Sequence, residues 1–145
     1  MKYAPLVVAA LLLGACETLP NAAPPPAQEG ARLEGELDLG DWRNASEAAT
    51  LSAFQHNVTS RYVAGLPLRS ATADLRGADF NCGAAPALDQ GRGDPPAQVC
   101  RRTVTVNGCT HTWQVHLFEE GGAVARPRGL YDRRCGNEGL LGGPG

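Results

Sequence analysis

The chain has 145 residues, a formal net charge of −2, 6% aromatic residues, and 18 glycines with 11 prolines. This length predicts one domain, and the scarcity of aromatic side chains predicts a small core that needs additional stabilisation. The net acidic charge argues against a nucleic-acid-binding domain, which is typically strongly basic.

Residues 1–15 have the pattern of an export signal. Lys2 supplies a positive charge, and the apolar run 6–13 is too short to span the roughly 30 Å hydrocarbon core of a bilayer. The order Leu13-Gly14-Ala15-Cys16 resembles the lipobox of bacterial lipoproteins. That resemblance implies cleavage before Cys16, diacylglycerol on its thiol and acylation of the new N-terminus.

Several acyl chains at Cys16 predict stable membrane attachment, because each buried CH₂ contributes about 0.8 kcal/mol and one chain alone binds only marginally. Glu17 follows Cys16 and is not the aspartate that resembles an inner-membrane retention signal. We therefore expect a lipid anchor at the outer membrane, on its periplasmic face. The alternative is an ordinary cleaved signal that leaves Cys16 as an incidental free thiol.

Residues 16–43 are predicted to form the lipidated N-terminus and a linker. The stretch 21–28 is rich in proline and alanine and favours an extended, disordered chain. The alternating leucines of 33–40 fit either a short edge strand or a continuation of the linker. The folded domain is then expected over 44–135, and the glycine-rich end, 136–145, as a flexible tail.

Two helices are predicted at the start of this domain. Asn44 and Glu47 have the spacing of a capping box, and an apolar stripe at helical spacing follows, which predicts a helix over 45–64. The stripe consists of Leu51, Phe54, Val58 and Tyr62. A second, shorter helix over 68–75 is expected to end at Gly77.

The clearest signal for strands lies between residues 100 and 118. Asn107-Gly108 is the preferred pair for a two-residue type I′ turn, and residues on both sides alternate. The turn predicts four facing pairs: Val106 with Cys109, Val104 with His111, Arg102 with Trp113, and Cys100 with Val115. We also expect the Arg102 guanidinium to stack on Trp113.

A further strand is predicted around 80–82, before a turn-rich loop over 83–98. The predicted fold class is therefore α+β, with two N-terminal helices packed on a three-stranded antiparallel sheet that disulfides staple.

Setting Cys16 aside leaves four cysteines, Cys82, Cys100, Cys109 and Cys135. An even number in an exported protein predicts two disulfides, and the absence of any C-x₂-C spacing argues against a zinc site. The hairpin separates Cys100 from Cys109 by roughly 20 Å, too far for a bond. Two pairings remain possible, and we favour Cys82–Cys100 with Cys109–Cys135.

The sequence proposes no catalytic residues, metal site or cofactor, and the chain is not expected to be an enzyme. His111 and His116 lie on opposite faces of one predicted strand and so cannot share a metal, and His56 has no ligand at a suitable spacing. No G-x-S-x-G or S-x-x-K pattern is present.

Arginines gather near the end of the predicted domain. Arg126, Arg128, Arg133 and Arg134 form a candidate contact patch for an anionic envelope partner. The alternative is an ordinary solvated surface.

The order helix, short helix, three antiparallel strands, behind a lipidated cysteine and linker, is similar to BamE/SmpA/OmlA-type outer-membrane lipoproteins and the related β-lactamase-inhibitor-protein-like fold. Residues Arg61-Tyr62-Val63-Ala64-Gly65-Leu66-Pro67, then Ala71, Leu75 and Phe80, resemble the helix–Gly–helix–strand passage of that family. The similarity spans about 45–118; the four cysteines and the long 83–98 loop depart from the pattern.

The resemblance implies a non-catalytic binding or scaffold module of the cell envelope, with a role in outer-membrane assembly or integrity. Its expected partners are the membrane, through the lipid, and an envelope protein or peptidoglycan; nucleic acid is not expected. The alternative is a lipid-tethered inhibitor of a periplasmic or secreted enzyme, with 83–98 as the inhibitory loop.

Overall fold

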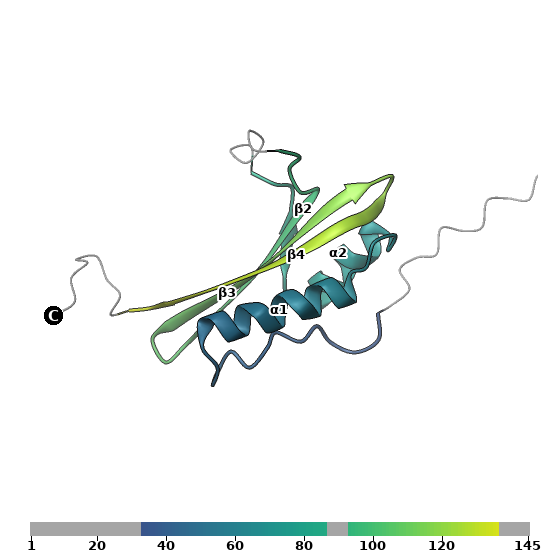
Figure 1. Cartoon of the computed structure of the whole chain (residues 1–145). Helices are drawn as coiled ribbons and strands as arrows, with labels where there is room; N and C mark the ends of the chain where they lie inside the picture. The colour runs from purple at the N-terminus through teal and green to yellow at the C-terminus, as the bar shows by residue number, and fades with distance from the viewer. Residues whose placement is uncertain (1–32, 87–92, 137–145) are drawn as a thin grey trace, which may run out of the picture.

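The computed structural model describes residues 33–86 and 93–136, which form two helices and a four-stranded antiparallel sheet (Figure 1). The elements are α1 (Glu47–Arg61), α2 (Leu68–Gly77), β1 (Asn81–Gly83), β2 (Gln98–Val106), β3 (Cys109–Glu120) and β4 (Ala123–Cys135). The predicted signal peptide, Cys16 and the tail beyond Gly136 lie outside the described residues. None of the helices within the described ranges has the length and apolar character needed to cross a bilayer.

The predicted hairpin is confirmed in its turn and its register. All four predicted pairs are present between β2 and β3, from Val106 opposite Cys109 to Cys100 opposite Val115. Asn107 and Gly108 have positive φ angles of 51° and 75°, as a type I′ turn requires. The predicted stacking of Arg102 on Trp113 is wrong, because the Arg102 Nη1 donates to the Ala78 carbonyl at 3.0 Å.

The predicted number of strands is also wrong, because residues 123–135 form a fourth strand, β4, paired antiparallel with β3. The positions of β4 that face the helices include Pro127 and Gly129, so the strand lacks the apolar alternation that marks β2 and β3. Gly129 suits this position because α1 crosses directly over it. A Cβ at this position would lie 3.2 Å from Phe54 Cδ1 and 3.2 Å from Val58 Cγ2.

Helix α1 begins two residues later than predicted, and its N-cap is Ser46. The Ser46 Oγ accepts a hydrogen bond from the backbone N–H of Ala49 at 3.2 Å. The predicted N-cap, Asn44, instead donates through its side-chain amide to Asp41 Oδ1 at 2.8 Å. The predicted apolar stripe is present, with Leu51 half-buried and the other three side chains fully buried.

The core lies between the helices and one face of the sheet, here called the inner face. On β3 the inner positions Trp113, Val115 and Leu117 are fully buried, whereas the alternate positions are only half-buried. Both helices therefore cover the same face, and α1 runs along β4 (Figure 1). The opposite, outer face carries no helix from the described part of the chain.

Residues 33–43, which we call the N-terminal strap, run beside α1 and complete the inner layer (Figure 1). Leu37 is buried in the core. The Asn57 side chain donates to the Asp38 carbonyl at 3.1 Å, and the Trp113 indole N–H donates to the Leu39 carbonyl at 3.3 Å. Residues 33–43, which the sequence placed in the predicted linker, therefore pack on the core without joining the sheet.

Both predicted disulfides are present. Cys82–Cys100 joins facing positions of β1 and β2, and Cys109–Cys135 joins facing positions of β3 and β4. Each bond crosses between neighbouring strands, so the two bonds together tie both outer strands of the sheet to the central hairpin.

Candidate functional site

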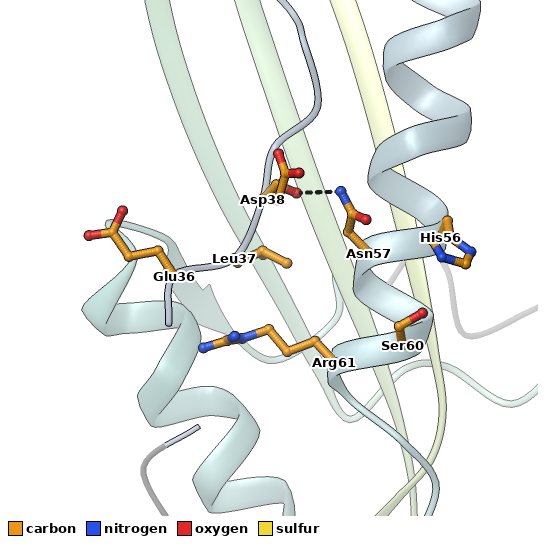
Figure 2. Close-up of a pocket in the computed structure, with 7 residues that line it drawn as sticks. All are labelled: Glu36, Leu37, Asp38, His56, Asn57, Ser60 and Arg61. Atoms are coloured by element: carbon orange, nitrogen blue, oxygen red, sulfur yellow. Dashed lines mark hydrogen bonds between the residues drawn. The ribbon is translucent and has the colours of Figure 1, made fainter. Parts of the chain in front are cut away.

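A shallow groove of about 280 Å³ separates the strap from α1 (Figure 2). Figure 2 shows that the side chains of Glu36 and His56 point away from each other, while Asn57 reaches across to Asp38. The Arg61 side chain extends along the groove towards α2. Because these polar groups do not converge on one point, the groove is a contact that holds the strap.

Arg61 is the centre of a network that joins both helices to the strap. Its guanidinium donates to both Asp74 oxygens at 2.7 and 2.8 Å and to the carbonyls of Glu34 and Gly35 at 3.1 and 2.7 Å. Tyr62 donates its hydroxyl to Asp74 at 2.7 Å. The hydrogen bond to Asp74 raises the pKa of Arg61, and burial followed by the same carboxylate raises the pKa of Tyr62. Arg61 therefore stays charged and Tyr62 stays neutral.

Four aromatic rings gather at the end of the inner face nearest the hairpin turn. Trp42 meets His111 edge-on with centroids 4.7 Å apart and meets Trp113 edge-on at 5.3 Å. His111 Nδ1 and the Tyr131 hydroxyl share a buried hydrogen bond of 2.7 Å. The strap thus supplies one ring, and the sheet supplies the other three.

Beside these rings lies a pocket of about 400 Å³, which we call the aromatic pocket. Its lining includes Trp42, Arg43, Asn107, Cys109, His111 and Arg133. Burial, and then the nearby positive charge of Arg133, lower the pKa of His111 below its usual value. The imidazole is therefore neutral at neutral pH, and the positive charge at the pocket comes from the arginines.

The predicted arginine patch is divided between the two faces of the sheet. Arg126, Arg128 and Arg134 lie at alternate positions of β4 on the outer face, whereas Arg133 lies on the inner face opposite His111 and lines the aromatic pocket. Arg134 pairs with Asp132 at 3.1 Å, at the opposite end of β4 from Arg126. The structure thus brings only Arg126 and Arg128 close together on one surface.

These two arginines belong to a mixed aromatic and basic surface, the outer-sheet patch, made up of Arg101, His116, Phe118, Arg126 and Arg128. The Arg126 guanidinium lies over the Phe118 ring at 3.7 Å from its centroid. Arg128 lies opposite His116 in the register of β3 and β4. In the described ranges, none of the three arginines forms an ion pair. Exposed arginine next to a half-buried aromatic ring is a combination that protein interfaces favour.

Comparisons with family models, curated proteins and solved structures found no match. The assignment of a site therefore depends on geometry. Across residues 33–86 and 93–136, no three His, Cys, Asp or Glu side chains are close enough together to hold a metal ion. Cys16, the predicted lipidation site, lies outside this part of the chain.

Sequence reasoning missed the aromatic pocket because it placed Trp42 and Arg43 in the linker. One signal pointed to the pocket: His111 is one of two polar members, with Arg102, of the mostly apolar face of the hairpin. The His111 side chain is buried. Its partners come from β4 and the strap, which the local pattern did not predict.

Proposed function

We propose that this chain is a lipid-anchored protein of a bacterial cell envelope that acts as a non-catalytic binding or scaffold module. Its outer-sheet patch is the docking surface. In this proposal the lipid anchor lies at the outer membrane, and a linker connects the anchor to the strap of the folded domain.

The observation that carries this proposal is the position of the strap. The strap enters the domain on its helical layer, where Arg61 and Asn57 hold it. The outer face of the sheet lies on the opposite side of the domain. A domain attached to a membrane through one layer can present its other layer to a partner. The two disulfides add support, because such bonds are typical of exported proteins.

The order of two helices followed by antiparallel strands also supports the proposed similarity to BamE/SmpA/OmlA-type lipoproteins. This chain differs from the three-stranded pattern of those lipoproteins in its fourth strand and its two disulfides. The envelope partner proposed from this similarity is an outer-membrane assembly protein.

Intact-mass spectrometry of protein extracted from membranes under non-reducing conditions tests the anchor. We expect a chain that begins at Cys16, carries the added mass of its acyl groups and has no free thiols. A full-length, unmodified chain with reactive thiols would contradict the proposal.

Crosslinking in intact envelopes tests the docking surface. The double variant Arg126→Glu/Arg128→Glu reverses two charges of the outer-sheet patch, and Arg69→Glu reverses one charge on the exposed side of α2. We expect the double variant to lose crosslinks to outer-membrane assembly proteins and Arg69→Glu to keep them. Equal crosslinking by both variants would show that the outer-sheet patch is not the docking surface.

One observation favours a second function, that of a tethered enzyme inhibitor. The Cys82–Cys100 disulfide closes the base of the loop between β1 and β2, and inhibitors commonly present a loop constrained in this way. Residues 87–92 of that loop lie outside the described ranges. Crosslinking of the loop to a hydrolase, with loss of that enzyme's activity, would support this function over the first.

A further inference from the structure

The aromatic pocket has the size and walls of a small-molecule site. Its volume of about 400 Å³ falls within the roughly 300–1,000 Å³ typical of ligand pockets. Trp42, Val106 and the disulfide-bonded Cys109 supply apolar walls, and each of these residues is half-buried. The pocket lies on the helical side of the sheet, away from the outer-sheet patch.

The charge of the pocket has one sign. Arg43 and Arg133 both line it, and its lining contains no aspartate or glutamate. In the part of the chain that the structure describes, neither arginine takes part in an ion pair. Two guanidinium groups without a carboxylate partner next to apolar walls favour an anion that carries an organic body.

The Arg43 side chain and the Arg133 backbone each have contacts that position them at the pocket. The Arg43 guanidinium lies over the Trp42 ring at 4.4 Å from its centroid, and such stacking holds the planar group in one orientation. The Arg133 backbone is fixed by pairing with His111 and by its N–H, which donates to Glu47 Oε1 at 3.3 Å. A guanidinium with a fixed plane matches the two oxygens of a carboxylate.

The pocket also offers neutral hydrogen-bonding groups. Asn107 extends from the hairpin turn, where it is exposed, and Asn44 keeps its side-chain carbonyl available after its amide donates to Asp41. Side-chain amides of this kind bind hydroxyl and acetamido groups. The walls therefore combine aromatic, cationic and amide character in one pocket.

We propose that the aromatic pocket binds a small sugar acid, in which one carboxylate is joined to an amide-bearing sugar ring. The carboxylate lies between Arg43 and Arg133, and the ring lies against the apolar wall with its polar substituents towards Asn44 and Asn107. The ligand chemistry follows from the pocket alone. Only the natural source, cell-wall glycan from which the peptides have been removed, rests on the proposed envelope location.

Tryptophan fluorescence provides a local measurement of binding. The chain contains two tryptophans, and Trp42 and Trp113 are in contact beside the pocket. Titration of the full chain in mild detergent with N-acetylmuramic acid is expected to change this fluorescence saturably. N-acetylglucosamine lacks the carboxylate, and D-lactate lacks the sugar, so both are expected to bind at least tenfold more weakly.

Three variants locate the site. Arg43→Gln and Arg133→Gln are each expected to weaken the binding of N-acetylmuramic acid about tenfold, because each removes a charged hydrogen-bond donor. Arg69→Gln, an exposed arginine on α2, is expected to bind as the unmodified protein does. Circular dichroism of all three variants checks that the fold is intact.

Several results would overturn the inference. One is the absence of saturable binding of N-acetylmuramic acid up to millimolar concentrations. Another is that N-acetylglucosamine or D-lactate binds as tightly as N-acetylmuramic acid. A third is that folded Arg43→Gln and Arg133→Gln bind N-acetylmuramic acid as tightly as the unmodified protein does. Each of them leaves the lipid anchor and the crosslinking of the outer-sheet patch unaffected. Failure of the inference is therefore distinguishable from failure of the proposed function.

Discussion

At the scale of single residues, His111 is the one buried histidine among the described residues. Its neutral form is favoured by burial and by the positive charge of Arg133, and it shares a hydrogen bond with the Tyr131 hydroxyl. A histidine with a lowered pKa in the folded state binds fewer protons than the same residue in the unfolded chain. Stability therefore depends on pH through this one side chain.

The sign of this dependence follows from linkage. The contribution of His111 is fully present above the unfolded pKa of about 6.5 and is lost as the pH falls towards the lower pKa of the folded state. We expect the free energy of unfolding, measured with urea, to fall between pH 7 and pH 5. His111→Gln should flatten this part of the curve, whereas His56→Gln, at an exposed position of α1, should preserve it. Parallel curves for the unmodified chain and His111→Gln would show that another group is responsible.

At the scale of secondary-structure elements, the contact between α1 and β4 depends on a missing side chain. Gly129 lets Phe54 and Val58 lie against the backbone of the strand. Any Cβ at that position pushes the helix away from the sheet or forces its side chains out of their preferred rotamers. The two layers therefore pack tightly against each other at a glycine.

Gly129→Val is expected to lower the free energy of unfolding by about 2–3 kcal/mol, as overpacking of a closely packed core does. Gly83→Val is the matched control, because Gly83 also lies in a strand and a Cβ there meets nothing within 4 Å. Chemical denaturation of both variants measures the difference. A loss of stability of the same size in both would mean that strand glycine itself, and not the contact with α1, is responsible.

How far the sequence predicts these elements depends on whether their signal is local. The hairpin was predictable in register because Asn107-Gly108 and two alternating strands lie next to one another in the chain. That register excluded a bond between Cys100 and Cys109 and left two pairings, of which the favoured one is present. Strand β4 was not predictable, because Pro127 and Gly129 suit a helix that packs on them from far away in the sequence. The aromatic pocket was missed for the same reason, since its walls come from three separate segments.

At the scale of the whole molecule, Arg61 and Asp74 connect the strap to the helices. Their side chains are each 14% exposed, so the pair is largely removed from water. Arg61 also holds the carbonyls of Glu34 and Gly35. Through Arg61, one ion pair therefore links α1, α2 and residues 34–35 of the strap.

Asp74→Asn leaves the Arg61 charge mostly buried without its partner, and we expect it to lower the free energy of unfolding by about 3 kcal/mol. We also expect faster amide exchange in residues 33–38. Asp132→Asn breaks the exposed pair with Arg134 and is expected to change stability by less than about 1 kcal/mol. Hydrogen–deuterium exchange and urea denaturation check both variants. Unchanged amide exchange in the strap of Asp74→Asn would show that the Arg61–Asp74 ion pair does not hold the strap in place.

The direction in which the strap runs has a mechanical consequence. From residue 34 to residue 39 its bonds are made in order to Arg61, Asn57 and Trp113, so the strap passes α1 from its last turn towards its first. Tension applied at Leu33 loads the bonds to Arg61 first and reaches Trp113 last. Under such tension we expect the strap to detach from the domain bond by bond, while the sheet, crosslinked by both disulfides, keeps its register.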